Sequence, residues 1–245
     1  MAYLKYINDE RINIARGLVR DTTFVHKFGA VPQMSISATG TIWDVNDTLY
    51  PWSAFNTPGV LNIPAVNVAD NGNVITVVGL DSNYNEISED FTVSNTGTTT
   101  GSTTFARVVR AFDTTGTNVA NINIQRASTV VARITAGKSQ TLMAVYTVPA
   151  GYTGYLMQGT ASIEAGGDAT GDMFVRYFGQ TSFRVGHTFE VEGQGGQYFY
   201  PFSVPIPIPE KSDIDVRANM RSNNSRMTAA FDIILIKNEG VGLRE

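Results

Sequence analysis

The chain has 245 residues and a mass of 26.6 kDa, which fits either one large all-β domain or two domains of ordinary size. Only 16% of the residues are charged, whereas 27 Thr, 18 Asn and 23 Gly favour pleated strands with many turns and exclude a helical bundle, a coiled coil or a disordered chain. The net charge of −4 argues against a nucleic-acid-binding surface, the absence of cysteine excludes disulfides and thiolate sites, and no apolar run could span a membrane.

Residues 1–38 differ from the rest of the chain and predict an N-terminal arm. The first ten residues lack the apolar run of a secretory signal, so we expect a chain that is made in a cytoplasm and not exported by that route. Residues 7–20 combine charges with apolar residues at approximately helical spacing, and Asn8 or Asp9 could cap a helix there. Because Gly17 weakens a helix, a short helix and an extended arm both remain open.

Residues 39–136 contain short strand signals bounded by Gly, Asn, Asp and Pro, which predict a β-sandwich of immunoglobulin-like or similar type. The clearest signal is a hairpin, in which the polar turn 81–86 joins strands at 74–79 and 87–93. The polar, low-complexity stretch 95–104 predicts an exposed loop. The other expected strands are 40–44, 59–65, 104–114 and 120–125.

Residues 137–245 predict a second β unit of about seven strands, which is close to the eight strands of a jelly roll. Pro205, Pro207 and Pro209 alternate with isoleucines and carry no amide proton, so this segment must mark a sheet edge, a wall or a contact with another chain. The expected strands are 141–148, 152–163, 173–178, 182–191, 197–204, 214–218 and 229–237. The predicted fold class is therefore all-β, with two sandwich units and an N-terminal arm.

Motifs for nucleotide or metal chemistry are incomplete. The stretch around Gly137 is similar to the end of a phosphate-binding loop, but Ala132 occupies the position of the required first glycine and a strand is expected to follow. We therefore interpret Gly137 as a turn residue. His26 and His187 have no partner at metal-ligand spacing, and no G-x-S-x-G element is present, so we expect no cofactor and no metal site.

Carboxylates two residues apart could serve catalysis or bind calcium, because spacing of two on a strand places both side chains on one face. Two such pairs are present, Glu190 with Glu192 and Asp213 with Asp215, and a solvent-facing strand edge explains both equally well. The segments 70–73 and 168–172 are similar to calcium loops only in composition, and β-turns explain them better.

Aromatic residues form two groups in the sequence. The first contains Trp43, Tyr50, Trp52 and Phe55, and the second is the segment 198–202. Exposed aromatic rings on a β-sandwich can stack on sugars, so a carbohydrate-binding module that uses Trp43, Trp52 or Tyr198 is one hypothesis. The alternative is that these rings fill the core or a surface between subunits.

Taken together, several stretches resemble a family of virion structural proteins from tailed bacteriophages, especially marine ones. These stretches are Val25–Gly29, Thr41–Asp44, Ile75–Glu89, Gln140–Gly151, Ile208–Ile214 and Phe231–Leu235. The likeness covers most of the chain, although none of the stretches is a mechanistic motif. It implies a role in the virus particle without enzymatic activity, and it transfers no catalytic residue.

We therefore expect a virion protein, most simply a capsid decoration (cement) protein that bridges major capsid subunits and associates with copies of itself, for example as a trimer. A neck, tail or fibre-adaptor position and a carbohydrate-binding module are the alternatives, and a glycan depolymerase using Glu190 and Glu192 is the enzymatic one. We expect no nucleic-acid or membrane partner. The expected interface residues are Ile12, Leu18, Phe24, Phe28, Trp52, Pro205, Pro207 and Pro209.

Overall fold

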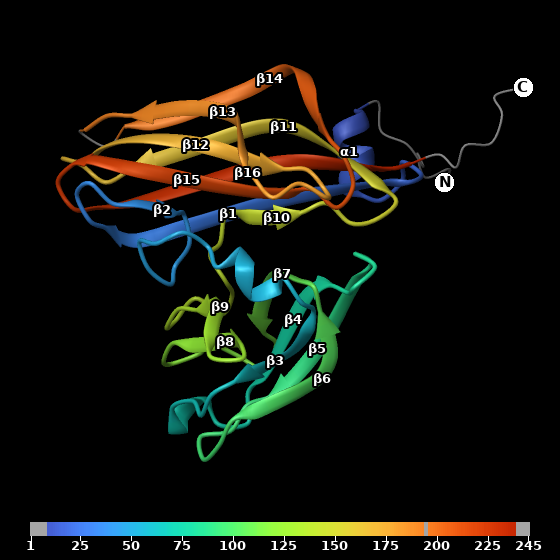
Figure 1. Ribbon diagram of the computed structural model, residues 1–245, viewed down its shortest axis with the longest axis vertical. Coiled ribbons are helices and arrows are strands. Elements are labelled where there is room, and N and C mark those ends of the chain that lie inside the picture. The colour runs from blue at the N-terminus through green and yellow to red at the C-terminus, as the bar shows by residue number, and fades with distance from the viewer. Residues whose placement is uncertain (1–8, 194–195, 239–245) are drawn as a thin grey trace, which may run out of the picture.

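The computed structural model describes residues 9–193 and 196–238, and strands dominate them (Figure 1). Four antiparallel sheets build two sandwiches, a larger one at the top of Figure 1 and a smaller one beneath it. The predicted all-β fold class is confirmed. The described residues include a single α-helix, α1 (Glu10–Ala15), and two 3-10 turns, η1 (Trp52–Phe55) and η2 (Val68–Asp70).

The larger sandwich is a jelly roll, as predicted. Its four-stranded sheet has the order β1 (Thr22–Met34), β16 (Ser225–Lys237), β11 (Tyr152–Ile163) and β14 (Gln197–Ile208). The facing sheet has the order β10 (Val145–Thr147), β15 (Asp213–Ser222), β12 (Asp168–Arg176) and β13 (Arg184–Val191), and β2 (Thr39–Thr41) also pairs with β15. Spatial neighbours in both sheets are distant in sequence, which is the crossed connectivity of two Greek keys.

The smaller sandwich holds the strands between β2 and β10. One sheet has the order β6 (Thr99–Phe105), β3 (Gly59–Ile63), β8 (Ile122–Arg126) and β9 (Thr129–Ile134), and the other has the order β5 (Glu86–Thr92), β4 (Val74–Leu80) and β7 (Arg107–Asp113). The predicted hairpin of β4 and β5 is confirmed. The predicted loop at 95–104 is wrong in its second half, because residues from Thr99 onward form β6, whose threonines suit an exposed, pleated strand.

The smaller sandwich interrupts one strand position of the jelly roll. Residues 39–41 of β2 pair with residues 219–217 of β15, and residues 145–147 of β10 pair with residues 215–213 of the same strand. The two short strands therefore lie end to end along β15 and run in the same direction. The small sandwich is an insertion between the two halves of what would otherwise be one strand.

The expected arm at 1–38 is wrong for residues 22–34. These residues form β1, which pairs with β16 along almost its whole length and places Val31 and Met34 in the jelly-roll core. The arm was expected because this segment has no nearby core of its own, but its core comes from the other end of the chain. The short helix is confirmed at α1, where the carboxylate of Asp9 accepts hydrogen bonds from the backbone of Arg11 and Ile12. Residues 1–8 of the predicted arm lie outside the described residues.

Each sandwich encloses its own apolar core. Leu156, Phe231 and Ile233 lie at the centre of the jelly roll, and Leu61, Ile75 and Phe105 lie at the centre of the inserted sandwich. Leu80 and Val109 of the insertion pack into the jelly-roll core, whereas Val145 of β10 packs into the core of the insertion. The two units therefore share apolar contacts at their junction.

Candidate contact face and interdomain junction

One face of the four-stranded sheet points away from the jelly-roll core. Phe24 pairs with Ile234, Ile234 with Tyr155, and Tyr155 with Pro207, so these side chains form a row across all four strands. The adjacent row, which includes Ile233 and Leu156, is buried in the core, and alternate residues of a strand point to opposite faces. The row of Phe24 is therefore on the outer face, where the Phe24 side chain is 46% exposed.

Two further rows lie next to it on this outer face. Phe28, Ala230, Thr160 and Phe199 are cross-strand neighbours, and Phe199 is 62% exposed. Between the two apolar rows lies a polar one, in which Asp232 links two side chains. Its carboxylate contacts Nδ1 of His26 at 2.5 Å and accepts a hydrogen bond from Nε2 of Gln158 at 2.7 Å. The central part of the outer face thus has two largely apolar rows with one satisfied polar row between them. The row beyond Phe28 is polar again, because the hydroxyl groups of Ser162 and Thr228 hydrogen-bond each other at 2.7 Å.

Helix α1 adds a hollow of about 370 Å³ at the end of this face. The hollow lies between the helix and strands β11, β14 and β16, and most of its lining is apolar. The apolar lining residues are Ile14, Val19, Tyr155, Met157, Pro205, Ile234 and Ile236. Because Ile236 is still 40% exposed, the helix leaves part of the face uncovered within the described residues.

Strand β14 forms the edge of the four-stranded sheet and is open along most of its length. Its twelve residues contain no charged side chain, and Val204 is 78% exposed. Pro201, Pro205 and Pro207 cannot donate a backbone hydrogen bond, which blocks addition of another strand at this edge. The prediction that the proline segment marks a sheet edge is confirmed.

Seven of the eight predicted interface residues lie near this sheet. They are placed on the outer face, on or just after α1, and in or just after β14, and they are Ile12, Leu18, Phe24, Phe28, Pro205, Pro207 and Pro209. Ile12 is 43% exposed on the helix. Contact of these residues with another subunit remains a prediction.

Asp213 joins the inserted sandwich to the jelly roll. Its buried carboxylate on β15 accepts hydrogen bonds from Nε of Arg107 at 2.8 Å and from Nη2 of Arg176 at 2.6 Å, and a third from Thr147 at 2.7 Å. Arg107 belongs to β7 of the insertion, whereas Arg176 ends β12. Burial lowers the pKa of Arg107, but the hydrogen bond and charge of Asp213 outweigh this and raise the pKa overall. The guanidinium therefore stays charged in the junction.

Asp215 forms a second link, and it corrects the prediction for Trp52. Its carboxylate accepts hydrogen bonds from Nε1 of Trp52 at 2.9 Å, from Thr41 at 2.8 Å and from Arg217 at 2.9 Å. Trp52 is only 8% exposed, so its ring holds the junction and cannot contact another subunit. Burial raises the pKa of Asp215, and Arg217, Trp52 and Thr41 lower it only part of the way back. The prediction that Asp213 and Asp215 could lie on a solvent-facing strand edge is also wrong, because the insertion covers both side chains.

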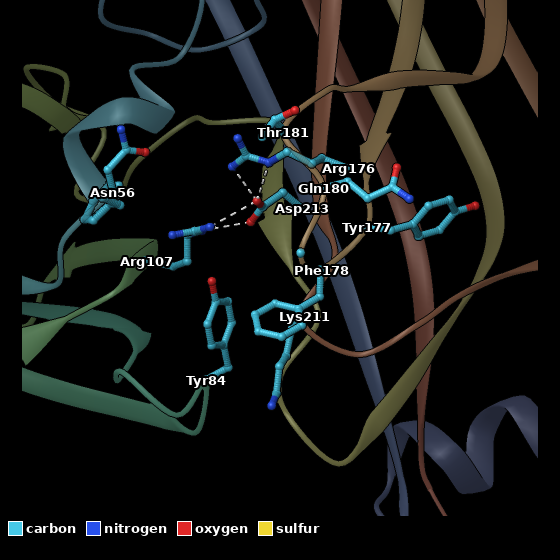
Figure 2. Close-up of a pocket in the computed structure, with 12 residues that line it drawn as sticks. Asn56, Tyr84, Arg107, Arg176, Tyr177, Phe178, Gln180, Thr181, Lys211 and Asp213 are labelled. Carbon is cyan, nitrogen blue, oxygen red and sulfur yellow. Dashed lines mark hydrogen bonds and ion pairs between the residues drawn. The ribbon is translucent and has the colours of Figure 1, made fainter.

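A cleft of about 430 Å³ opens beside this junction (Figure 2). Arg107 and Arg176 point toward Asp213 from the two units, and the turn after β12 forms the opposite wall with Phe178. The cleft is lined by Phe55, Asn56, Tyr84, Arg107, Arg176, Tyr177, Phe178, Gly179, Gln180, Thr181, Lys211 and Asp213. Sequence reasoning missed it, because no local pattern connects residues 84, 107, 176 and 211.

The other candidate carboxylates have structural surroundings. Glu190 and Glu192 lie on exposed strand ends, with side chains 56% and 76% exposed beside Arg221, so they form a solvent-facing edge and not a catalytic cleft. Asp70 is buried and accepts hydrogen bonds from the backbone of Val119 and Ala120, while the backbone of Asn73 bonds back to Asp70 in the predicted turn. Among residues 9–193 and 196–238, no group of three or more His, Asp or Glu side chains could hold a metal ion.

The turn predicted at 168–172 is wrong. These residues begin β12, and the carboxylate of Asp168 accepts hydrogen bonds from the backbone of Gly193 at 2.7 Å and from Ser222 at 2.8 Å. Gly137 is a turn residue, as predicted, with a φ of +72° that favours glycine. His187 lies within the aromatic cluster of β13 and β14, where its Nε2 contacts the hydroxyl of Tyr198.

The first aromatic group fills the core. Trp43, Tyr50 and Phe55 are each 2 to 3% exposed, and Tyr50 packs edge-on against both tryptophans. A sugar-binding platform built on Trp43 or Trp52 is therefore wrong, because both side chains are buried. In the second group, Tyr198 is partly buried against Phe189, with ring centroids 5.2 Å apart.

Comparisons with known proteins give structural likeness at a low level. No family model matches the sequence, and no curated protein matches it. Among solved structures, naturally occurring empty particles of cowpea mosaic virus align at 8% identity over 77% of this chain and 88% of that chain, with a TM-score of 0.25. The VP2 subviral particle of infectious bursal disease virus aligns at 9% identity over 89% of this chain and 73% of that chain, with a TM-score of 0.23. No helix among the described residues is long and apolar enough to cross a membrane.

Proposed function

We propose that this protein is a structural subunit of a virus particle, most simply a capsid decoration protein that bridges major capsid subunits. The observation that carries the proposal is the outer face of the four-stranded sheet, where Phe24 and Phe199 are 46% and 62% exposed on either side of one polar row. Exposed apolar rings gathered on one sheet face are typical of a protein contact site. The sequence resemblance to virion proteins of tailed bacteriophages supports the same class.

The mechanism that we propose is mechanical. The outer face and the edge strand β14 would pack on a neighbouring subunit, while the Arg107–Asp213 ion pair and the hydrogen bond from Trp52 to Asp215 hold the inserted sandwich at a fixed angle to the jelly roll. The neighbour would be a major capsid subunit or another copy of this chain, with a trimer as the simplest symmetric assembly. Each copy would then oppose the pressure of the packaged genome by spanning adjacent subunits.

A position in the neck, tail or fibre base is the closest alternative within this class. Copy number separates the two, because symmetry places on the order of hundreds of decoration subunits on a capsid but only about six or twelve subunits in a neck or tail ring. We expect the larger number in quantitative gel analysis of purified particles. The smaller number would contradict the decoration role and leave the contact face in place.

Charged substitutions on the outer face test the proposal directly. We expect Phe24→Asp and Phe199→Asp each to reduce incorporation of the protein into particles at least about tenfold, because a carboxylate would be buried without a partner in the contact. Val68→Asp is the matched control, since Val68 is 73% exposed on the inserted sandwich, away from this sheet. Circular dichroism and thermal melting should show all three variants folded.

Equal incorporation of the two face variants and the control would contradict the proposal. Loss of incorporation with Val68→Asp alone would also contradict it, because the contact would then lie on the insertion. A variant that fails to melt cooperatively is replaced by Phe24→Ser or Phe199→Ser, which remove the ring without adding a charge.

A further inference from the structure

The cleft beside the junction carries an excess of positive charge. Its lining holds three cations, Arg107, Arg176 and Lys211, against the single carboxylate of Asp213, which leaves a formal excess of two positive charges. The whole chain has the opposite sign, with a net charge of −4. A cationic cleft on an acidic protein favours an anionic ligand, because the field inside a cleft is focused by its walls.

Lys211 is the cation that is not neutralised. Both guanidinium groups bind Asp213, whereas no ion pair of Lys211 is found within the described part of the chain. Its ammonium nitrogen lies 5.1 Å from the ring centroid of Phe178, at the wall of the cleft. The side chain of Arg176 is 18% exposed, so its guanidinium also reaches the open space. A carboxylate at the Lys211 end of the cleft could accept a charge-assisted hydrogen bond from this ammonium group.

Aromatic rings form the second feature of the cleft. Tyr84 of the insertion meets Phe178 of the jelly roll edge-on, with centroids 5.6 Å apart and an interplanar angle of 80°. Phe178 is nevertheless 60% exposed, so part of its apolar surface faces the opening, whereas Figure 2 shows the ring of Tyr177 directed away from it. Exposed rings next to cations can hold the apolar face of a ring-shaped ligand.

Hydrogen-bonding side chains form the third feature. Asn56, Gln180 and Thr181 are exposed at the rim, and Figure 2 shows the amides of Asn56 and Gln180 on opposite sides of the ion pairs. Amide groups both donate and accept hydrogen bonds, and so they match hydroxyl groups. A wholly apolar ligand would leave these groups unpaired, and a bare inorganic anion would leave the aromatic rings uncovered.

We propose that this cleft binds an acidic sugar, that is, a pyranose ring bearing a carboxylate. The carboxylate faces Lys211, one face of the ring lies against the neighbouring Phe178, and the hydroxyl groups point toward the polar rim of the cleft. This site is separate from the contact face on the four-stranded sheet and from the buried tryptophans. It does not depend on the proposed assembly role.

Titration of the isolated protein tests this site with three probes: methyl glucuronide, methyl glucoside and inorganic phosphate. We expect methyl glucuronide to bind with a Kd on the order of millimolar, and the other two probes to bind at least about tenfold more weakly, because each lacks one of the two recognised features. Ligand-observed NMR is suited to affinities in this range. Equal binding of the glucoside would overturn the role of the cations, and equal binding of phosphate would overturn the role of the rings.

Variants then locate the binding site. Lys211→Ala and Phe178→Ala should each weaken glucuronide binding at least about fivefold, and Lys211→Arg should retain it. Lys237→Ala is the control, since Lys237 is exposed at the end of β16 and lies outside the cleft. Unchanged binding in both alanine variants, or no detectable binding of glucuronide to the folded wild type at about twenty times the expected Kd, would overturn the proposal. Particle incorporation is read separately, so failure here leaves the assembly proposal intact.

Discussion

At the scale of single residues, Lys27 is a buried amine at the boundary of the two sandwiches. Its Nζ donates a hydrogen bond of 2.6 Å to the backbone oxygen of Val109, which lies on β7 of the insertion. Burial, with a smaller contribution from the charge of Arg110, lowers the pKa of Lys27 to about 7. The jelly roll and the insertion are therefore joined through a group whose charge changes near neutral pH.

This pKa makes the stability of the protein depend on pH in a definite direction. An unfolded lysine keeps its proton up to about pH 10, so above pH 7 the unfolded chain binds more protons than the folded one and stability rises with pH. We expect a gain of about 3 kcal/mol from this group between pH 7 and 10, measured by urea denaturation. Lys27→Met should remove that gain, whereas Lys237→Met at an exposed site should keep it. Parallel pH profiles for wild type and Lys27→Met would contradict the assignment.

At the scale of elements, β14 shows how an open sheet edge is kept from pairing. Pro201, Pro205 and Pro207 remove amide donors from a strand that contains no charged side chain. In an edge strand, every second backbone nitrogen faces solvent and takes no part in the ladder. Prolines at these positions therefore cost no hydrogen bond within the sheet. The strand can therefore present Phe199 and Val204 for side-chain packing without inviting another strand.

Replacement of these prolines tests this role. We expect Pro205→Thr together with Pro207→Thr to restore two donors at the edge and to cause concentration-dependent aggregation with a rise in thioflavin fluorescence. Pro209→Thr is the matched control, because Pro209 follows the strand and lies outside the ladder. Aggregation equal to that of the control would contradict the claim that Pro205 and Pro207 prevent strand pairing at this edge.

Elements with a local signal could be predicted, and those that depend on distant partners could not. Strand β11 was predicted with its observed bounds, 152–163, and the hairpin of β4 and β5 follows from alternation around a polar turn. Strand β6 was hidden because its Thr and Gly content is typical of a loop as well as of an exposed strand. The register of β1 against β16 was invisible for another reason, since some two hundred residues separate Phe24 from Ile234.

At the scale of the whole molecule, the two sandwiches do not follow one another along the chain. The smaller one is inserted between β2 and β10 of the jelly roll. The two sheets of the jelly roll are complete only when β1 pairs with β16 and β2 pairs with β15. The N-terminal and C-terminal segments of the jelly roll must therefore come together although the inserted sandwich lies between them in the sequence. The contacts of Asp213 with Arg107 and of Asp215 with Trp52 arise from this topology. For that reason the two carboxylates, which the sequence suggested could lie on an exposed edge, are buried. The role of Asp213, Asp215 and Trp52 in joining the two sandwiches becomes visible only in the contacts between them.

The link between Arg107 and Asp213 should couple the unfolding of the two units. We expect one cooperative transition in calorimetry of the wild type, and Arg107→Met should lose about 3 kcal/mol because it leaves Asp213 without one of its buried partners. We also expect the melting of the inserted sandwich to separate from that of the jelly roll in this variant. Arg110→Met is the control, since Arg110 is exposed on the same strand. A single unshifted transition in Arg107→Met would contradict this coupling.

The central claim is that the outer face of the β1-β16-β11-β14 sheet is a contact surface in a virus particle. An electron-microscopy map of the particle whose genome encodes this chain tests it most directly. The claim predicts density for this chain with Phe24 and Phe199 packed against a neighbouring subunit. A map in which that face is open to solvent, or in which the chain is absent from the particle, would contradict it.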